Sequence, residues 1–116
     1  MKSLVSSFRF AFTGIIRGFI MEKNLRIQVC MGFLMIFFAI YFHVSNTEWA
    51  ILIICCGLVL CLEMINTAIE KLSDVVSPEC NVEIKIVKDL AAGSVLFASV
   101  MSVLVALFIF LPKIRI

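Results

Sequence analysis

The sequence predicts an all-α integral membrane protein with an N-terminal amphipathic interfacial helix and three transmembrane helices. Hydrophobic residues make up 63% of the 116-residue chain, and the mean hydropathy of +1.16 is well above that of soluble domains. In addition, apolar runs of about the thickness of a bilayer alternate with short polar segments. The length allows one domain, which we take to be residues 1–116.

The first segment, residues 1–24, predicts a helix that lies at the membrane surface. Arg9 and Arg17 interrupt its apolar pattern, so the segment is a poor candidate for a spanning helix. The apolar side chains would enter the lipid, and the arginines would reach the headgroups. The same arginines argue against a cleaved signal peptide, which needs an uninterrupted apolar stretch.

The first membrane helix is predicted at residues 27–44, a nearly unbroken apolar run long enough for one crossing. A short turn at residues 45–48 follows, where Asn46 or Thr47 could cap the next helix. The apolar run at 49–62 is too short to span a bilayer alone. We therefore expect the second helix to continue through Glu63 to Val76.

Proline marks both limits of the third membrane helix, which is predicted at residues 84–111. Ser77-Pro78 should end the second helix, because the residue before a proline disfavours helical geometry. A serine before a proline is also a good start for a new helix. The third apolar run, from Leu90 to Leu111, is closed by Pro112.

The distribution of basic residues predicts the orientation in the membrane. The turn at 45–48 has none, and Lys113 and Arg115 depart mildly from the pattern. By the positive-inside rule, the N-terminus and the 71–89 segment face the cytoplasm. The basic residues on that side are Lys2, Arg9, Arg17, Lys23, Arg26, Lys71, Lys85 and Lys88.

The strongest functional signal is a polar stripe within the second membrane helix. Its members are spaced three, four and four residues apart, which places them within roughly 80° of one helix face. The stripe, called here the acid face, consists of Glu63, Asn66, Glu70 and Asp74. Three acids stacked on one face repel one another, and a cation would relieve the repulsion. Oxygen ligands with gaps for water and phosphate suit Mg²⁺. The plain alternative is a solvated helix end that leaves the membrane.

Several other function classes lack support in the sequence. It contains no Walker A motif, no kinase glycine loop and no histidine pair for zinc. The net charge of +2 is too small to indicate nucleic-acid binding. The five cysteines form no CxxC pair, and we interpret the four in apolar runs as small buried hydrophobic residues: Cys30, Cys55, Cys56 and Cys61.

The segment from Glu63 to Asp74, followed by Ser77-Pro78-Glu79 and by Lys85 to Leu96, resembles the signature of the small prokaryotic diacylglycerol kinases. It is most similar to the Gram-positive branch, whose members act as undecaprenol kinases. A departure from the family pattern is Cys80-Asn81, where relatives usually carry tyrosine and histidine.

The resemblance implies an ATP- and Mg²⁺-dependent kinase that phosphorylates the hydroxyl of a membrane lipid. Undecaprenol is the expected substrate, and diacylglycerol is the alternative. The resemblance also implies a homotrimer in the bacterial inner membrane, with sites shared between subunits. The positive-inside rule independently places the active site on the cytoplasmic face. A transporter or a regulatory subunit is a different possibility, because intramembrane acids also mark ion pathways.

The residues of the acid face receive specific roles as hypotheses. Glu63 lies deepest, where a lipid hydroxyl can reach it, and partial desolvation suits it to act as general base; the resemblance implies the same role. Asn66 would orient Glu63 or a phosphate. Glu70 would bind Mg²⁺, and the resemblance matches Glu22 with the second metal-binding glutamate.

Nucleotide and substrate contacts are assigned to further residues. Asp74 and Lys88 would hold the nucleotide together with the two metal-binding glutamates, and Asp89 would brace that lysine or the loop. The resemblance matches Phe10 with an aromatic residue near the adenine. Phe10 lacks a hydroxyl and could only stack, so an ordinary lipid-facing phenylalanine is the better interpretation. Arg26 is assigned to substrate binding beside Glu63, or to a simple ion pair with Glu22 four residues before it.

Overall fold

The structure is a computed structural model that describes residues 3–79 and 81–114. In this part of the chain all regular structure is helical, which confirms the expected all-α class. The helices are α1 (Leu4–Met21), α2 (Lys23–Tyr41), α3 (Asn46–Val76) and α4 (Val82–Ile114).

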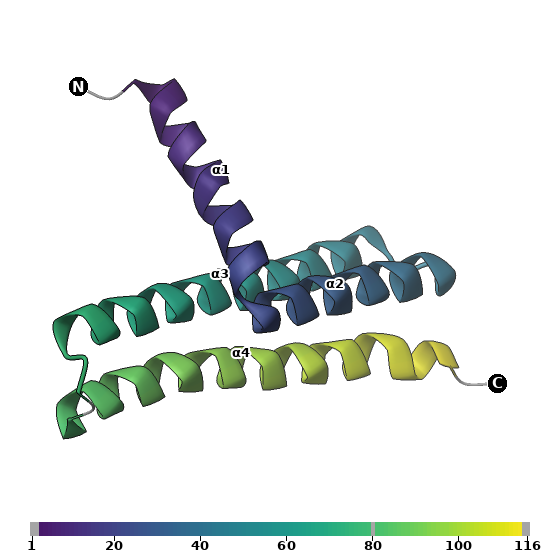
Figure 1. The fold of residues 1–116 in the computed structure, drawn as a ribbon. Coiled ribbons are helices and arrows are strands. Elements are labelled where there is room, and N and C mark those ends of the chain that lie inside the picture. Colours follow the sequence, from purple (N-terminus) through teal and green to yellow (C-terminus); the bar gives the residue numbers. More distant parts are fainter. Residues whose placement is uncertain (1–2, 80, 115–116) are drawn as a thin grey trace.

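Three of the helices lie side by side, and α1 projects from them at a steep angle (Figure 1). The most extensive interface joins α3 and α4, and α2 packs mainly on α3. α2 has 19 residues, whereas α3 and α4 have 31 and 33. The ends of α3 and α4 next to the 77–81 loop therefore extend beyond α2 (Figure 1).

Helix length indicates how the bundle relates to a bilayer. At about 1.5 Å per residue, α3 and α4 each exceed the roughly 30 Å hydrocarbon core by about 15 Å or more. Among the described residues, four helices are long and apolar enough to cross a membrane, and α1 is one of them. Length and composition thus do not separate α1 from the three expected spans, and its interfacial position stays a prediction.

The α2–α3 turn differs in detail from the expected one. α2 ends at Tyr41, because Phe42 and His43 form the turn, with His43 in the left-handed region at φ 54°. Ser45, rather than Asn46 or Thr47, caps α3. Its hydroxyl accepts a hydrogen bond from the Glu48 amide (3.2 Å), and the Glu48 carboxylate accepts one from the Ser45 amide (2.9 Å). This reciprocal pair is a capping box.

α3 ends at Val76, as the following Ser77-Pro78 predicts. Asn81, rather than Ser77, caps α4: its side-chain oxygen accepts a hydrogen bond from the Ile84 amide at 2.8 Å. α4 passes through Pro112 to Ile114 instead of ending before the proline. A proline this close to the helix end removes only one backbone hydrogen bond, so the helix tolerates it.

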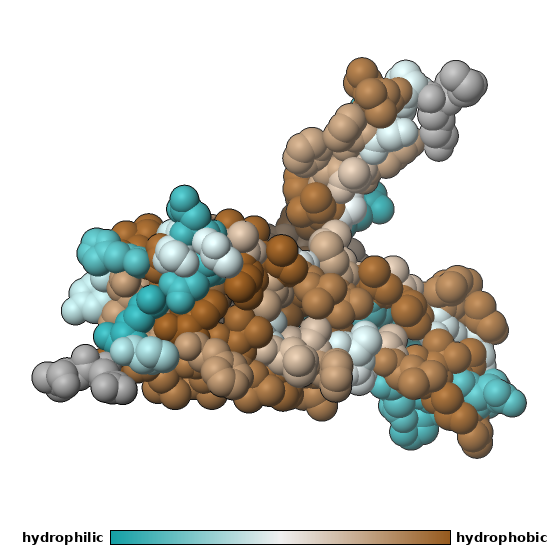
Figure 2. Space-filling model, turned by 180° about the vertical axis from the view of Figure 1, so that it is seen from behind, coloured by the Kyte–Doolittle hydropathy of each residue, from teal (hydrophilic) through white to brown (hydrophobic). Residues whose placement is uncertain are grey.

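Most of the molecular surface is apolar, and hydrophilic side chains gather at the two ends of the bundle (Figure 2). The compact core is small and lies near the α2–α3 turn, where Ala39, Val44, Leu52 and Ile109 are buried. Outward-facing side chains of a membrane helix meet lipid or another subunit, not the interior of their own chain.

The cysteines illustrate this point. Cys30 and Cys61 are exposed on the surface of the chain, and Cys55 and Cys56 are only partly buried, so the expectation of buried thiols was wrong. All four are free thiols. Cys80 lies outside the described residues.

Candidate active site

A polar cleft opens between α2, α3 and α4, at the point where α2 begins. Its volume is about 290 Å³. Two members of the acid face, Glu63 and Asn66, line it and are almost completely buried, with exposed fractions of 4% and 8%. The remaining lining residues are Asn24, Ile27, Gln28, Ala92, Val95, Leu96 and Ser99. The deepest predicted site residues thus face a real cleft in an otherwise apolar bundle.

Asn66 is positioned to act on Glu63. It lies one helical turn after Glu63, and its side-chain amide forms a hydrogen bond with the Glu63 carboxylate. Its carbonyl oxygen Oδ1 is buried and accepts no hydrogen bond from any residue that the structure describes. Thr67 is tied to the same turn, since its hydroxyl donates to the Glu63 backbone carbonyl at 3.1 Å. An acceptor buried without a partner costs free energy, and Asn66 carries this one at the edge of the cleft.

The three glutamates of the predicted site lie near one another. Glu22 and Glu70 are both close enough to Glu63 for their charges to act on its carboxylate. Glu22 is the junction residue between α1 and α2, and from this position its charge acts on Glu63 of α3. Among the described residues, however, no three His, Cys, Asp or Glu side chains come together closely enough to hold a metal by themselves.

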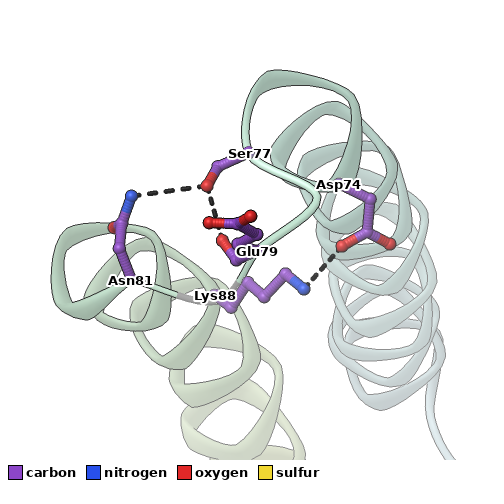
Figure 3. Close-up of polar contacts among 5 residues, drawn as sticks. All are labelled: Asp74, Ser77, Glu79, Asn81 and Lys88. Atoms are coloured by element: carbon purple, nitrogen blue, oxygen red, sulfur yellow. Dashed lines mark hydrogen bonds and ion pairs between the residues drawn. The ribbon is translucent and has the colours of Figure 1, made fainter.

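A second group of charges lies at the loop end of the bundle. Lys88 of α4 reaches across to Asp74 of α3, with 2.7 Å between Nζ and Oδ1 (Figure 3). Asp89 forms an ion pair with Lys85 at 2.7 Å rather than with Lys88. Two of the residues predicted to hold the nucleotide, Asp74 and Lys88, are therefore in direct contact.

The same loop is braced by polar contacts (Figure 3). The Ser77 hydroxyl donates to the backbone carbonyl of Glu79, and the Asn81 amide donates to the Ser77 hydroxyl at 3.4 Å. Asn81 also caps α4. The residue that departs from the family pattern thus has a structural task at the start of α4.

Arg26 and Phe10 lie apart from the cleft. Arg26 Nη1 donates to the carbonyl oxygens of Phe19 (2.9 Å) and Ile20 (2.8 Å), so it binds the last turn of α1 instead of pairing with Glu22. Phe10 is 57% exposed and belongs to the half of α1 that points away from the other helices (Figure 1). Within one chain it does not join Asp74 and Lys88. The roles of both residues in binding stay predictions.

Sequence reasoning missed three polar residues of the cleft. Asn24, Gln28 and Ser99 line it beside Glu63 and Asn66. Gln28 and Ser99 are polar residues within apolar runs, and this feature of the sequence could have indicated that they line a polar site. Sequence alone does not show that they face the same cleft as Glu63, because that depends on how three helices pack.

Comparison with known proteins agrees with this geometry. The family described as prokaryotic diacylglycerol kinase matches residues 9–110, from α1 to the last turns of α4. A protein from Synechocystis named diacylglycerol kinase is 36% identical over 111 residues, which cover 95% of this chain and 63% of that protein. A protein from Bacillus subtilis named undecaprenol kinase is 32% identical over 113 residues, which cover 97% of this chain and 92% of that protein. The chain thus spans less than two thirds of the Synechocystis relative and nearly all of the Bacillus one. It belongs to the prokaryotic diacylglycerol kinase family.

Proposed function

We propose that the chain is an ATP- and Mg²⁺-dependent kinase that phosphorylates the hydroxyl of a membrane lipid. The observation that carries the proposal is a buried carboxylate, Glu63, in a polar cleft of an apolar bundle. From this cleft the acid face leads along α3 to the Asp74–Lys88 pair at the loop. Family membership supports the same activity.

Undecaprenol is the proposed substrate, and diacylglycerol is the alternative. The Bacillus relative, which this chain covers almost completely, is named undecaprenol kinase. The Synechocystis relative is named diacylglycerol kinase. An apolar groove of about 360 Å³ adjoins the polar cleft and shares Ile27, Gln28 and Ser99 with it. The groove offers a hydrocarbon chain a place beside Glu63, which supports a lipid alcohol as acceptor.

The transfer step assigns the proton to Glu63. The lipid hydroxyl oxygen forms a bond with the γ-phosphorus of ATP, the bond to the β-phosphate oxygen breaks, and ADP leaves. Glu63 takes the hydroxyl proton as general base. Asn66 holds the carboxylate in orientation through its amide. Lys88, held in place by Asp74, contacts the phosphates of the nucleotide, with Asp89 and its partner Lys85 bracing the start of α4.

The carboxylates fit a magnesium ion. Mg²⁺ is commonly held by one or two carboxylates together with water and substrate phosphates, so a site without a three-ligand protein cage suits it. Glu22 and Glu70 are the proposed ligands, and the free Oδ1 of Asn66 is a further oxygen nearby. When bound, the ion would neutralise phosphate charge during transfer.

We also propose a homotrimer in the bacterial inner membrane. In it, α1 lies at the membrane surface, and the active site opens on the cytoplasmic side. The loop ends of α3 and α4 extend beyond α2, so a neighbouring chain could cover them (Figure 1). This covering chain could also bring Phe10 and Arg26 toward a nucleotide or lipid. The mass of the protein in detergent tests the assembly: a monomer at all concentrations would contradict it.

The test of the proposed activity is transfer of labelled γ-phosphate from Mg-ATP to undecaprenol and to diacylglycerol in detergent. We expect Glu63→Gln and Glu70→Gln to lower turnover by at least about 100-fold, the scale of a lost general base. Glu83→Gln is the matched control, because Glu83 is an exposed acid outside the acid face.

Each outcome separates one part of the proposal. Robust turnover in Glu63→Gln would remove the base assignment. Faster phosphorylation of diacylglycerol than of undecaprenol would reverse the substrate assignment. A wild-type protein that is folded and phosphorylates neither lipid, but carries a cation flux in vesicles, would favour the transport alternative.

A further inference from the structure

A second charged cleft, separate from the one at Glu63, lies between α1 and α3. Its volume is about 370 Å³. Arg17 of α1 and Lys71 of α3 line it, and Thr67 adds a hydroxyl. The other lining residues are small or apolar: Gly14, Gly18, Met21, Leu25, Met64 and Ala68. We call it the cationic cleft. No acid is among its lining residues.

The two cations of this cleft lack acidic partners. Among the described residues, neither Arg17 nor Lys71 forms an ion pair, whereas Lys85, Lys88 and Lys113 each pair with an acid. Arg17 and Lys71 are both exposed, so water screens their mutual repulsion but leaves both charges available to a ligand. An anion between them would relieve the repulsion and bind both.

The cationic cleft begins at the helical turn that carries the reaction. Met64 follows Glu63 directly, and the Thr67 hydroxyl is hydrogen-bonded to the Glu63 carbonyl. At about 100° per residue, Met64 and Lys71 lie roughly 80–100° around α3 from Glu63. The cleft therefore opens on the neighbouring face of the same helix, and a lipid headgroup could move from one face to the other.

We propose that the cationic cleft binds the phosphomonoester headgroup of the phosphorylated lipid after transfer; this inference rests on the proposed kinase function. A phosphomonoester carries roughly −1.5 to −2 charges at neutral pH, which matches two cations. The arginine fork can contact two phosphate oxygens. The lipid alcohol is uncharged, so the cleft distinguishes product from substrate, and its apolar wall accommodates the start of the lipid chain.

The glycines of α1 provide a way to test the cleft by shape as well as by charge. A Cβ at Gly14 would meet nothing within 4 Å, so a larger side chain there can enter the cleft without a clash. At Gly18 a Cβ would lie 3.1 Å from Leu25 Cδ2, because α1 and α2 approach closely there. Gly14→Leu therefore fills the cleft and leaves both cations in place.

The experiment measures binding of undecaprenyl phosphate to the detergent-solubilised protein without ATP, with undecaprenol and phosphatidylglycerol as comparison lipids. We expect Arg17→Gln/Lys71→Gln to weaken binding of the phosphate lipid by at least about tenfold, the scale of a lost charge-assisted contact. Gly14→Leu should weaken it as well. The matched control, Arg9→Gln/Lys23→Gln, removes two charges outside the cleft and should bind as the wild type does.

Two results would overturn the inference: wild-type affinity in both the double variant and Gly14→Leu, or equal affinity for phosphatidylglycerol and undecaprenyl phosphate. Arg17→Lys/Lys71→Arg keeps both charges and should retain binding, which separates lost charge from a folding defect. Because binding needs no catalysis, failure of the kinase proposal would appear separately, as absent turnover in a protein that still binds the phosphate lipid through this cleft.

Discussion

At the scale of single residues, Asn66 links the fold to the proposed chemistry. A buried amide oxygen without a partner costs about 1–3 kcal/mol, so packing alone gives no reason to keep it. The side-chain NH₂ of the same residue contacts Glu63, and Asn66 lines the cleft where substrate would enter. Asn66 therefore fits a positioning role whose benefit arises only during turnover.

This role predicts a separation of stability from activity. Asn66→Ala removes the unpaired acceptor. The free energy of unfolding in detergent should therefore increase, or decrease by less than about 1 kcal/mol. Turnover should fall at least about tenfold, because the general base loses its orienting contact. Melting and phosphoryl transfer would be measured on the same preparation, with Ser99→Ala as a control that removes another polar group of the cleft. Parallel loss of stability and activity in Asn66→Ala would mean that the residue is structural.

The sequence predicted the acid face because helical spacing is fixed within one helix. It could not predict that Gln28 and Ser99 join Glu63, because this depends on the register between three helices. Arg26 shows the same limit. Its sequence distance from Glu22 suits an ion pair, yet the end of α1 presents two carbonyl oxygens closer to it.

At the scale of elements, α3 and α4 share the most extensive interface of the bundle, and one ion pair adds to it near the 77–81 loop. The Asp74–Lys88 pair crosses from helix to helix, but the two side chains are 67% and 33% exposed. Solvent screens such a pair, so it should contribute less than about 1 kcal/mol to stability. The pair lies at the end of the acid face where the nucleotide is proposed to bind. Its role there is to hold Lys88 within reach of the phosphates.

Asp74→Asn should therefore leave stability within about 1 kcal/mol of the wild type. The KM for ATP should rise at least about fivefold, the scale of about 1 kcal/mol of lost binding free energy. Lys85→Gln is the comparison variant, because it breaks the similarly exposed pair with Asp89 without removing a proposed ligand. If both variants change the KM equally, the pairs serve only to shape the loop.

Helix ends were predictable where the backbone itself forbids continuation and not elsewhere. Pro78 ends α3, as expected. The end of α2 falls at Tyr41, inside an apolar run, and apolar composition alone does not distinguish the end of a membrane helix from the turn that follows it. Caps depend on which side chain reaches the free amides, so Ser45 and Asn81 replaced the nearby candidates.

At the scale of the whole molecule, the charges at the two ends of the bundle indicate its orientation. Lys113, which departed from the positive-inside pattern, forms an ion pair with Glu48 at 3.1 Å. Its charge is thereby balanced at the end of the bundle opposite the 77–81 loop. Most of the other basic residues lie on the other side, with α1 and the loop, and the predicted orientation rests on this distribution. Arg115 lies outside the described residues.

This orientation predicts opposite labelling of the two loops. In a variant whose five cysteines are replaced by alanine or serine, Glu79→Cys should react with a membrane-impermeant thiol reagent only in inverted membrane vesicles. Thr47→Cys should react only in intact cells, because the turn before α3 lies on the outer face. Glu79 and Thr47 are both exposed, so neither result depends on opening the bundle. Labelling of Glu79→Cys in intact cells would place the Asp74–Lys88 pair away from cytoplasmic ATP. A kinase that draws on ATP needs the acid face to open inward, so that result would contradict the proposed function together with the orientation.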